Sequence, residues 1–196
     1  MLSGVTLQPV DTPTDFESMV GEIEQSGFDE LWLTDSSLHA KNVYSFLTLA
    51  ARASHRLQLG TAVTNPVTRH PAVTAAAAAT IDEVSDGRFA LGIGAGDRPL
   101  LALGYKPATL ARLEGAISAM RQLWDGGHVT FEGDGFRLDD AHMREPAQRQ
   151  VPIYMSASGP KTLTLAGRVA DGVILLAGLH PEGLTWALDH IDRGVE

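Results

Sequence analysis

Short apolar runs alternate with segments of helical periodicity along most of the chain, and this alternation constrains the fold more than any single residue does. Each of six runs is followed by a segment whose apolar residues recur at helical spacing; the runs cover residues 4–7, 31–34, 57–63, 89–93, 152–155 and 173–176. Nearly continuous apolar strands are typical of parallel strands covered on both faces. The sequence therefore predicts an α/β protein, built either as a doubly wound sheet or as a (β/α)8 barrel.

Local signals mark the helix boundaries. Thr12, Pro13 and Asp15 supply a capping hydroxyl, a proline for the first helical position and a carboxylate near the positive end of the helix dipole. Gly27 ends this helix, and Pro71 opens an alanine-rich one. Further helices are predicted at about 43–53, 71–84, 110–124, 161–170 and 181–191.

The regular alternation breaks between residues 126 and 150. Two short apolar segments, Val129–Phe131 and Phe136–Leu138, flank the turn sequence Glu-Gly-Asp-Gly and predict a small hairpin. No linker or repeat divides the chain. We therefore expect residues 1–196 to form a single domain with an insertion at about 126–150.

Composition excludes several classes of function. Fifteen basic and 24 acidic residues give a net charge of −9, which would repel a nucleic acid. The lack of cysteine excludes thiol nucleophiles and thiolate metal sites and fits a cytoplasmic location, and the seven histidines show no paired metal spacing, so no metal is assigned. No apolar run approaches the roughly 20 residues of a membrane span, so no membrane partner is expected.

Candidate chemistry is concentrated at strand ends. Residues 92–97 read Gly-Ile-Gly-Ala-Gly-Asp, which either lets a flat ligand approach the backbone or forms a simple turn. Residues 156–161 join a strand to a helix and suit a phosphate, or form an ordinary loop. Asp35 and Asp97 follow the second and fourth strands, where α/β folds place their active sites, although an acid there can also cap a helix. Serine-hydrolase and P-loop motifs are missing from the sequence.

Several longer strings carry a family resemblance. They are residues 59–71 (LGTAVTNPVTRHP), 80–89 (TIDEVSDGRF), 91–97 (LGIGAGD), 152–161 (PIYMSASGPK) and 170–173 (ADGV). Together they resemble the luciferase-like monooxygenase superfamily, and within it the branch of coenzyme F420-dependent oxidoreductases that includes methylenetetrahydromethanopterin reductase. The strings follow the family's order over nearly the whole chain.

The resemblance implies a TIM-type (β/α)8 barrel with an insertion after the fourth helix, and a non-prolyl cis peptide around Ala62 and Val63. It implies the deazaflavin coenzyme F420 as cofactor, with FMN as the alternative. Asp97 and Asp35 are the implied catalytic residues. The implied cofactor-binding residues are Asp35, Ala62, Val63, Thr64, Asn65, Ala95 and Gly96 around the ring, with Ala157, Ser158, Gly159, Pro160 and Lys161 at the phosphate.

The chain of 196 residues is short for such a barrel, which has eight strands and typically ~250 residues. The sequence supplies only the first six β/α units plus the insertion hairpin, which leaves the first and sixth strands as edges. A fragment, a natural truncation and a shortened member with edges covered in a homo-oligomer, such as a dimer, all remain open.

Three functions follow from this reading. The first is hydride transfer between F420 and a small organic substrate. The second is an FMN-dependent monooxygenase of the same superfamily, and the third is a truncated, non-catalytic binding or assembly protein. The sequence does not specify the substrate, because the remaining part of a barrel would help to build its pocket.

Overall fold

The computed structural model describes residues 2–176, 178 and 180–196. The strands are β1 (Gly4–Leu7), β2 (Glu30–Leu33), β3 (Gln58–Thr61), β4 (Phe89–Ile93), β5 (Val129–Gly133), β6 (Phe136–Ala141), β7 (Ile153–Ala157) and β8 (Gly172–Leu175). The helices are α1 (Pro13–Gln25), α2 (Val43–Ala53), α3 (Pro71–Val84), α4 (Arg98–Ala102), α5 (Leu110–Trp124), α6 (Pro160–Val169) and α7 (Pro181–Val195).

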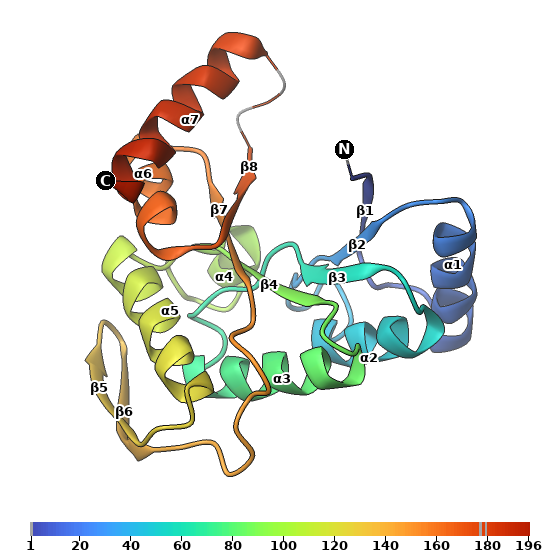
Figure 1. Cartoon of the computed structure of the whole chain (residues 1–196), viewed down its shortest axis with the longest axis horizontal. Coiled ribbons are helices and arrows are strands. Elements are labelled where there is room, and N and C mark those ends of the chain that lie inside the picture. The colour runs from blue at the N-terminus through green and yellow to red at the C-terminus, as the bar shows by residue number, and fades with distance from the viewer. Residues whose placement is uncertain (1, 177, 179) are drawn as a thin grey trace.

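Six parallel strands form one curved sheet in the order β1-β2-β3-β4-β7-β8, and successive helices pack side by side along its outer face (Figure 1). Within the described residues, β1 pairs only with β2 and β8 only with β7, so the sheet is an open half-barrel whose first and sixth strands are edges, as expected.

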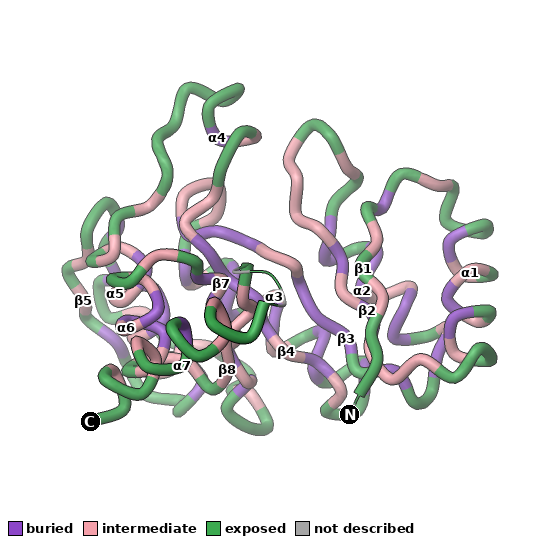
Figure 2. Tube along the Cα trace, turned by 90° about the horizontal axis from the view of Figure 1, so that it is seen from above, coloured by how far each residue is buried: buried purple, intermediate pink, exposed green. Residues whose placement is uncertain are grey.

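Burial alternates along the strands. Leu31, Leu33 and Met155 point toward the helices and are buried, whereas Trp32 and Tyr154 on the inner face are only half-buried. The buried positions follow the strands through the middle of the molecule in Figure 2. The prediction that both faces are covered is therefore correct for the outer face and wrong for the inner one, because the open sheet does not enclose its interior.

Aromatic side chains occupy part of the inner face. The rings of Trp32 and Tyr154 meet edge to face with centroids 5.5 Å apart. A Cβ at Gly60 would lie 2.2 Å from the Trp32 ring, and one at Gly172 would lie 2.5 Å from the Tyr154 ring. Glycine on the neighbouring strands thus makes room for both aromatic residues.

The predicted helix boundaries agree closely with the structure. Thr12 caps α1 by accepting the Asp15 N–H at 3.2 Å, and α3 begins at Pro71. The short helix α4 was not predicted, because five residues are too few to show a helical period.

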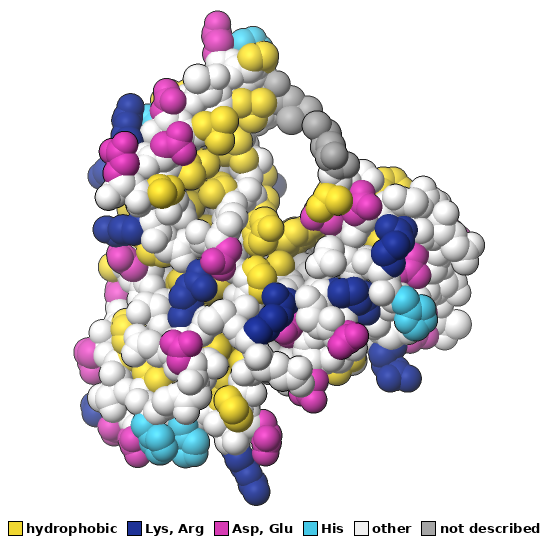
Figure 3. All heavy atoms as spheres, viewed as in Figure 1, with side chains coloured by type: hydrophobic (Ala, Val, Ile, Leu, Met, Phe, Trp, Pro, Cys, Tyr) yellow, Lys and Arg dark blue, Asp and Glu magenta, His cyan; other side chains and the backbone are white. Residues whose placement is uncertain are grey.

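The interruption between residues 126 and 150 contains the expected antiparallel hairpin, β5 and β6, which lies beside α5 (Figure 1). At the opposite end, α7 and the residue that follows β8 carry exposed hydrophobic side chains, among them Leu176, Trp186 and Leu188. Figure 3 shows hydrophobic atoms gathered on this flank. Among the described residues, no helix is long and apolar enough to span a bilayer.

Candidate functional site

A cavity of about 630 Å³ lies where β2, β3, β4 and β7 end, which is the edge of the sheet that carries active sites in barrels. Its volume is in the range of small-molecule sites. The residues that line it are Thr6, Thr34, Asp35, Ser36, Ala62, Val63, Asn65, Gly94, Ala95, Gly96, Asp97, Pro99, Leu100, Ser156, Ala157, Ser158, Thr162, Ile174 and Leu176.

Most of the site residues expected from the sequence meet at this cavity. Thr64, Gly159, Pro160 and Lys161 are the exceptions among them and are not part of its lining. Thr64 is fully buried behind the wall, while Lys161 is exposed. Thr162, which does line the cavity, was not predicted.

The end of β3 is fastened to β4 beside the cavity. The peptide bond between Ala62 and Val63 is cis, at the place that the family resemblance implies. The Thr64 N–H donates to the Gly92 carbonyl at 2.9 Å, and the Gly94 N–H donates to the Thr64 carbonyl at 2.9 Å. These bonds fix the backbone that carries the middle of the cavity wall.

The glycines of residues 92–97 have separate local causes. A Cβ at Gly92 would lie 1.8 Å from the Thr61 carbonyl oxygen, so strand packing alone requires glycine there. A Cβ at Gly94 would lie 3.0 Å from the Val63 side chain, which is a tight contact. Gly96 has a φ of +83°, a backbone conformation that favours glycine. Of the three, Gly94 and Gly96 line the cavity.

Asp35 forms a buried ion pair that the sequence analysis missed. Its side chain is only 4% exposed, and the Arg69 guanidinium donates to both carboxylate oxygens, with Nη2 3.1 Å from Oδ1. The Thr64 hydroxyl donates to Oδ2 at 2.8 Å. Arg69 lies within one of the strings that carry the resemblance, but nothing in the residue pattern pairs it with Asp35.

Tyr44 on α2 lies on the other side of this ion pair. The Arg69 guanidinium carbon is 5.0 Å from the centroid of the Tyr44 ring, within reach of a cation–π interaction. The Tyr44 hydroxyl is buried close to the hydroxyls of Thr64 and Thr74, but it makes no hydrogen bond of good geometry among the described residues. Burial raises the pKa of Tyr44 to about 12, so the phenol is neutral near pH 7.

Asp97 follows a strand and lines the same cavity as Asp35, but it differs from Asp35 in burial and in hydrogen bonding. It is exposed, it precedes α4, and its side chain makes no capping bond to that helix. Within the part of the chain that the structure describes, no hydrogen bond or ion pair engages its carboxylate. A free carboxylate on a cavity wall can accept a proton from a bound molecule or return one to it.

The loop expected to bind phosphate is partly occupied by its own contacts. The Gly159 N–H donates to the Thr162 hydroxyl at 3.1 Å, and that hydroxyl donates to the Gly159 carbonyl at 2.8 Å. Thr162 also lines the cavity, together with Ser158. Ser156 and Ser158 from this segment and Thr162 from α6 are the polar residues that line the cavity here.

The cavity suits a flat organic group with hydrogen-bonding edges. Its wall contains the small side chains of Ala62 and Ala95, and the buried Thr34 hydroxyl has no partner within the described chain. A deazaflavin or flavin ring has carbonyl and N–H groups that could satisfy such an atom. No cluster of three metal-ligating side chains occurs among the described residues.

Comparison with known proteins gives a consistent picture. The sequence matches the luciferase-like monooxygenase family over residues 2–196. It is 40% identical over 200 residues to the 5,10-methylenetetrahydromethanopterin reductase of Archaeoglobus fulgidus, which covers 100% of this chain and 58% of the reductase. It is 36% identical over 182 residues to the F420-dependent glucose-6-phosphate dehydrogenase of Nakamurella multipartita, which covers 86% of this chain and 54% of that enzyme.

Among solved structures, the coenzyme F420-dependent tetrahydromethanopterin reductase from Methanopyrus kandleri superposes with a TM-score of 0.90 at 29% identity, covering 99% of this chain and 60% of that one. The chain thus spans 58% of the length of the Archaeoglobus reductase. Its curved sheet corresponds to part of the TIM-type barrel that the resemblance implies. With a family match over residues 2–196, the chain belongs to the luciferase-like monooxygenase family.

Proposed function

We propose that this protein is an oxidoreductase that transfers a hydride between coenzyme F420 and a small organic substrate. The observation that carries the proposal is the cavity at the strand ends, which brings together Asp35, Ala62, Asn65, Ala95 and Asp97 from separate parts of the chain. The relatives named as F420-dependent support the choice of cofactor.

The cofactor-binding residues we propose are those implied by the family resemblance. Asp35, Ala62, Val63, Thr64, Asn65, Ala95 and Gly96 would hold the ring, and Ala157, Ser158, Gly159, Pro160 and Lys161 the phosphate. The deazaflavin supplies or accepts the hydride when it is bound. Thr162 lines the cavity beside Ser158, and its hydroxyl, which donates to the Gly159 carbonyl at 2.8 Å, would hold the phosphate loop in shape rather than bind the phosphate itself.

Asp97 is the residue we propose for proton transfer. Its exposed carboxylate lines the cavity and is not held by a helix cap. It would exchange a proton with the substrate while the cavity wall orients the reacting groups. Asp35, which the resemblance implies as a second catalytic residue, lines the same cavity but is bound by Arg69.

We further propose that residues 1–196 form one partial barrel unit with the 126–150 insertion, that the unit works in the cytoplasm, and that it forms a homo-oligomer. The half-buried inner face and the edge strands β1 and β8 support self-association, since unpaired strand edges favour pairing. Sedimentation of the purified chain would test this directly: a single monomeric species at micromolar concentration would contradict it.

Parallel titrations of the purified chain with F420 and with FMN, followed by fluorescence, test the proposed cofactor. We expect saturable binding of F420 and weaker binding of FMN. Ala95→Phe, which fills the cavity, should abolish binding, whereas Ala111→Phe on the exposed face of α5 should leave it unchanged.

Each other result has a definite meaning. Preference for FMN would replace the proposal by a flavin-dependent monooxygenase, and oxygen consumption with reduced FMN would then be measured. Binding of neither cofactor by a folded chain would favour the non-catalytic alternative.

A further inference from the structure

We propose that Arg69 is a positioning residue: it holds Asp35 as a fixed, charge-compensated acceptor in the cavity wall and leaves proton transfer to Asp97. This rests on the proposed function, because it assigns different tasks to the two carboxylates of one cavity. Its structural basis is a contrast: Arg69 holds both carboxylate oxygens of Asp35, whereas the carboxylate of Asp97 has no partner among the described residues.

The geometry of the pair is that of a bidentate fork. The guanidinium of Arg69 donates to both oxygens of Asp35, and the Thr64 hydroxyl donates another hydrogen bond to Oδ2 at 2.8 Å. The side chains of Asp35 and Arg69 are 4% and 18% exposed. A fork of this kind fixes the plane of the carboxylate as well as its distance.

The loop from β3 to α3 is shaped to deliver Arg69 to this position. The Asn65 side-chain oxygen accepts the N–H groups of Val67 and Thr68 at 3.0 and 2.9 Å, which bends the chain back toward β2. Arg112 on α5 donates from Nε to the Pro66 carbonyl at 3.1 Å. The loop is therefore held from inside and from a neighbouring helix.

Tyr44 completes the enclosure of the guanidinium. Its ring lies 5.0 Å from the Arg69 guanidinium carbon, so the cation is held between an aromatic face and a carboxylate. Planar stacking and a bidentate fork together suit arginine and not lysine.

Loss of Arg69 would change the cavity electrostatically. Arg69 is paired with Asp35, and Asp97 lines the same cavity. The neutral hydroxyls near Asp35 belong to Thr64 and Tyr44. Without the guanidinium, two uncompensated carboxylates would line one cavity and repel an anionic cofactor. Neutralising Asp35 would remove that repulsion.

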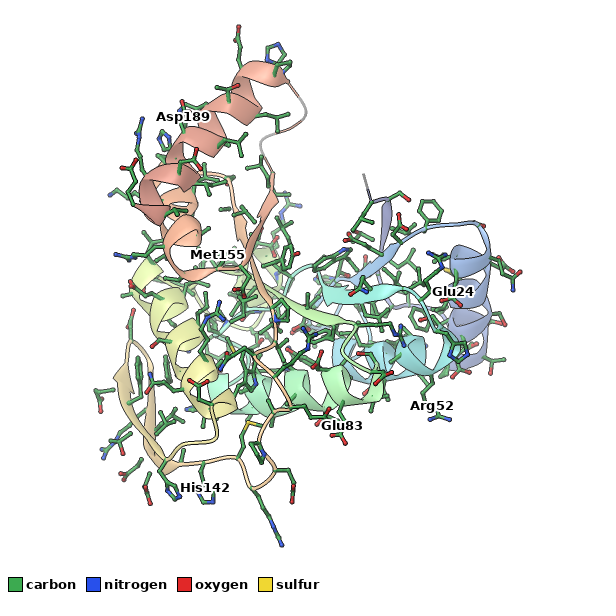
Figure 4. The ribbon with its side chains drawn as sticks, viewed as in Figure 1. Glu24, Arg52, Glu83, His142, Met155 and Asp189 are labelled. Carbon is green, nitrogen blue, oxygen red and sulfur yellow. The ribbon has the colours of Figure 1, made fainter. Side chains whose placement is uncertain are left out.

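A double-mutant cycle on F420 binding tests this assignment. Arg69→Met should weaken binding by ~10-fold or more, whereas the same change made in an Asp35→Asn background should alter binding by less than ~3-fold. Arg52→Met is the matched control, because Arg52 is an exposed arginine on α2 that points away from the sheet (Figure 4). A purely structural role for Arg69 predicts the same loss of binding in both backgrounds and would overturn the proposal.

Unfolding by urea between pH 5 and 8 gives a second readout that needs no ligand. In Arg69→Met, Asp35 stays buried with only the neutral Thr64 hydroxyl as its partner. The missing positive charge favours the protonated form of Asp35, so stability should fall as the pH rises. The Asp35→Asn, Arg69→Met double variant should not show this fall. A pH dependence in Arg69→Met equal to that of Arg52→Met would refute the ion-pair argument.

The two readouts separate this proposal from the proposed function. If the wild-type chain binds neither F420 nor FMN, the proposed function fails while the unfolding cycle still tests whether Arg69 compensates Asp35. If F420 binds and Arg69→Met binds it as tightly as Arg52→Met does, the proposed function stands and the role of Arg69 is refuted.

Discussion

Replacing Arg149 by methionine should destabilise the fold strongly, because this arginine joins the end of the insertion to the base of the barrel. Its Nε and Nη2 donate to the two oxygens of Asp82 at 2.9 and 2.6 Å, and Nη2 also reaches the Gly87 carbonyl at 2.7 Å. Asp82 is on α3 with a side chain 7% exposed, whereas Arg149 is 39% exposed.

The expected loss of stability follows from the unequal burial of Asp82 and Arg149. Removing one partner of a fully buried pair costs ~3–5 kcal/mol, because the other charge is left without compensation. Solvent access to the Arg149 side reduces this figure, so we expect a loss of about 2–3 kcal/mol. For a chain of this size each kcal/mol lowers the melting temperature by ~2–4 °C.

Urea denaturation with matched variants checks the reasoning. Arg144→Met removes an exposed arginine from the same segment and should change stability by less than ~0.5 kcal/mol. Adding Asp82→Asn to Arg149→Met should recover part of the loss, since the stranded charge is then gone. A loss below ~0.5 kcal/mol for Arg149→Met itself would show that water compensates Asp82 fully and would refute the argument.

Three further changes have defined outcomes. Asp97→Asn should retain F420 binding and lose turnover, and an unchanged rate with an identified substrate would remove Asp97 from the proposed mechanism. Tyr44→Phe removes a buried hydroxyl that makes no hydrogen bond of good geometry among the described residues, so thermal unfolding should show a gain of ~1 kcal/mol, and a clear loss would show that the hydroxyl is hydrogen-bonded. The pKa of Glu24 is lowered, because hydrogen bonds from the N–H groups of residues 55–57 outweigh the opposing effect of burial. The wild type should therefore lose stability as the pH falls from about 5 toward 3, and urea titrations of Glu24→Gln should show less of this loss.

The sequence predicts the helices and strands well because their signals are local. A hydroxyl, a proline and an acid within four positions locate the start of α1, and the apolar run 89–93 is β4 from its first residue to its last. Such signals depend on neighbours a few residues away. The position of the cis peptide came from the family resemblance, because no local pattern indicates one.

The ion pairs could not be predicted in the same way. Arg69 lies 34 residues from Asp35, and Arg149 lies 67 residues from Asp82. No periodicity joins positions so far apart, and the chain contains 39 charged residues from which to choose a partner, namely 15 basic and 24 acidic. Only the folding of the whole sheet with its connecting loops brings these groups together. The same holds for Thr162, which reaches the cavity because α6 turns its first residues toward the strand ends.

The two acids of the cavity show how far a residue pattern can be taken. In the sequence Asp35 and Asp97 are equivalent, since each follows an apolar run and each could cap a helix. In the structure one is buried and held by a guanidinium, and the other is exposed with no capping bond. A carboxylate that is already compensated is a poor partner for a moving proton, because its charge is stabilised in one form only. The difference between the two acids is therefore set by Arg69, a residue that lies on neither of their strands.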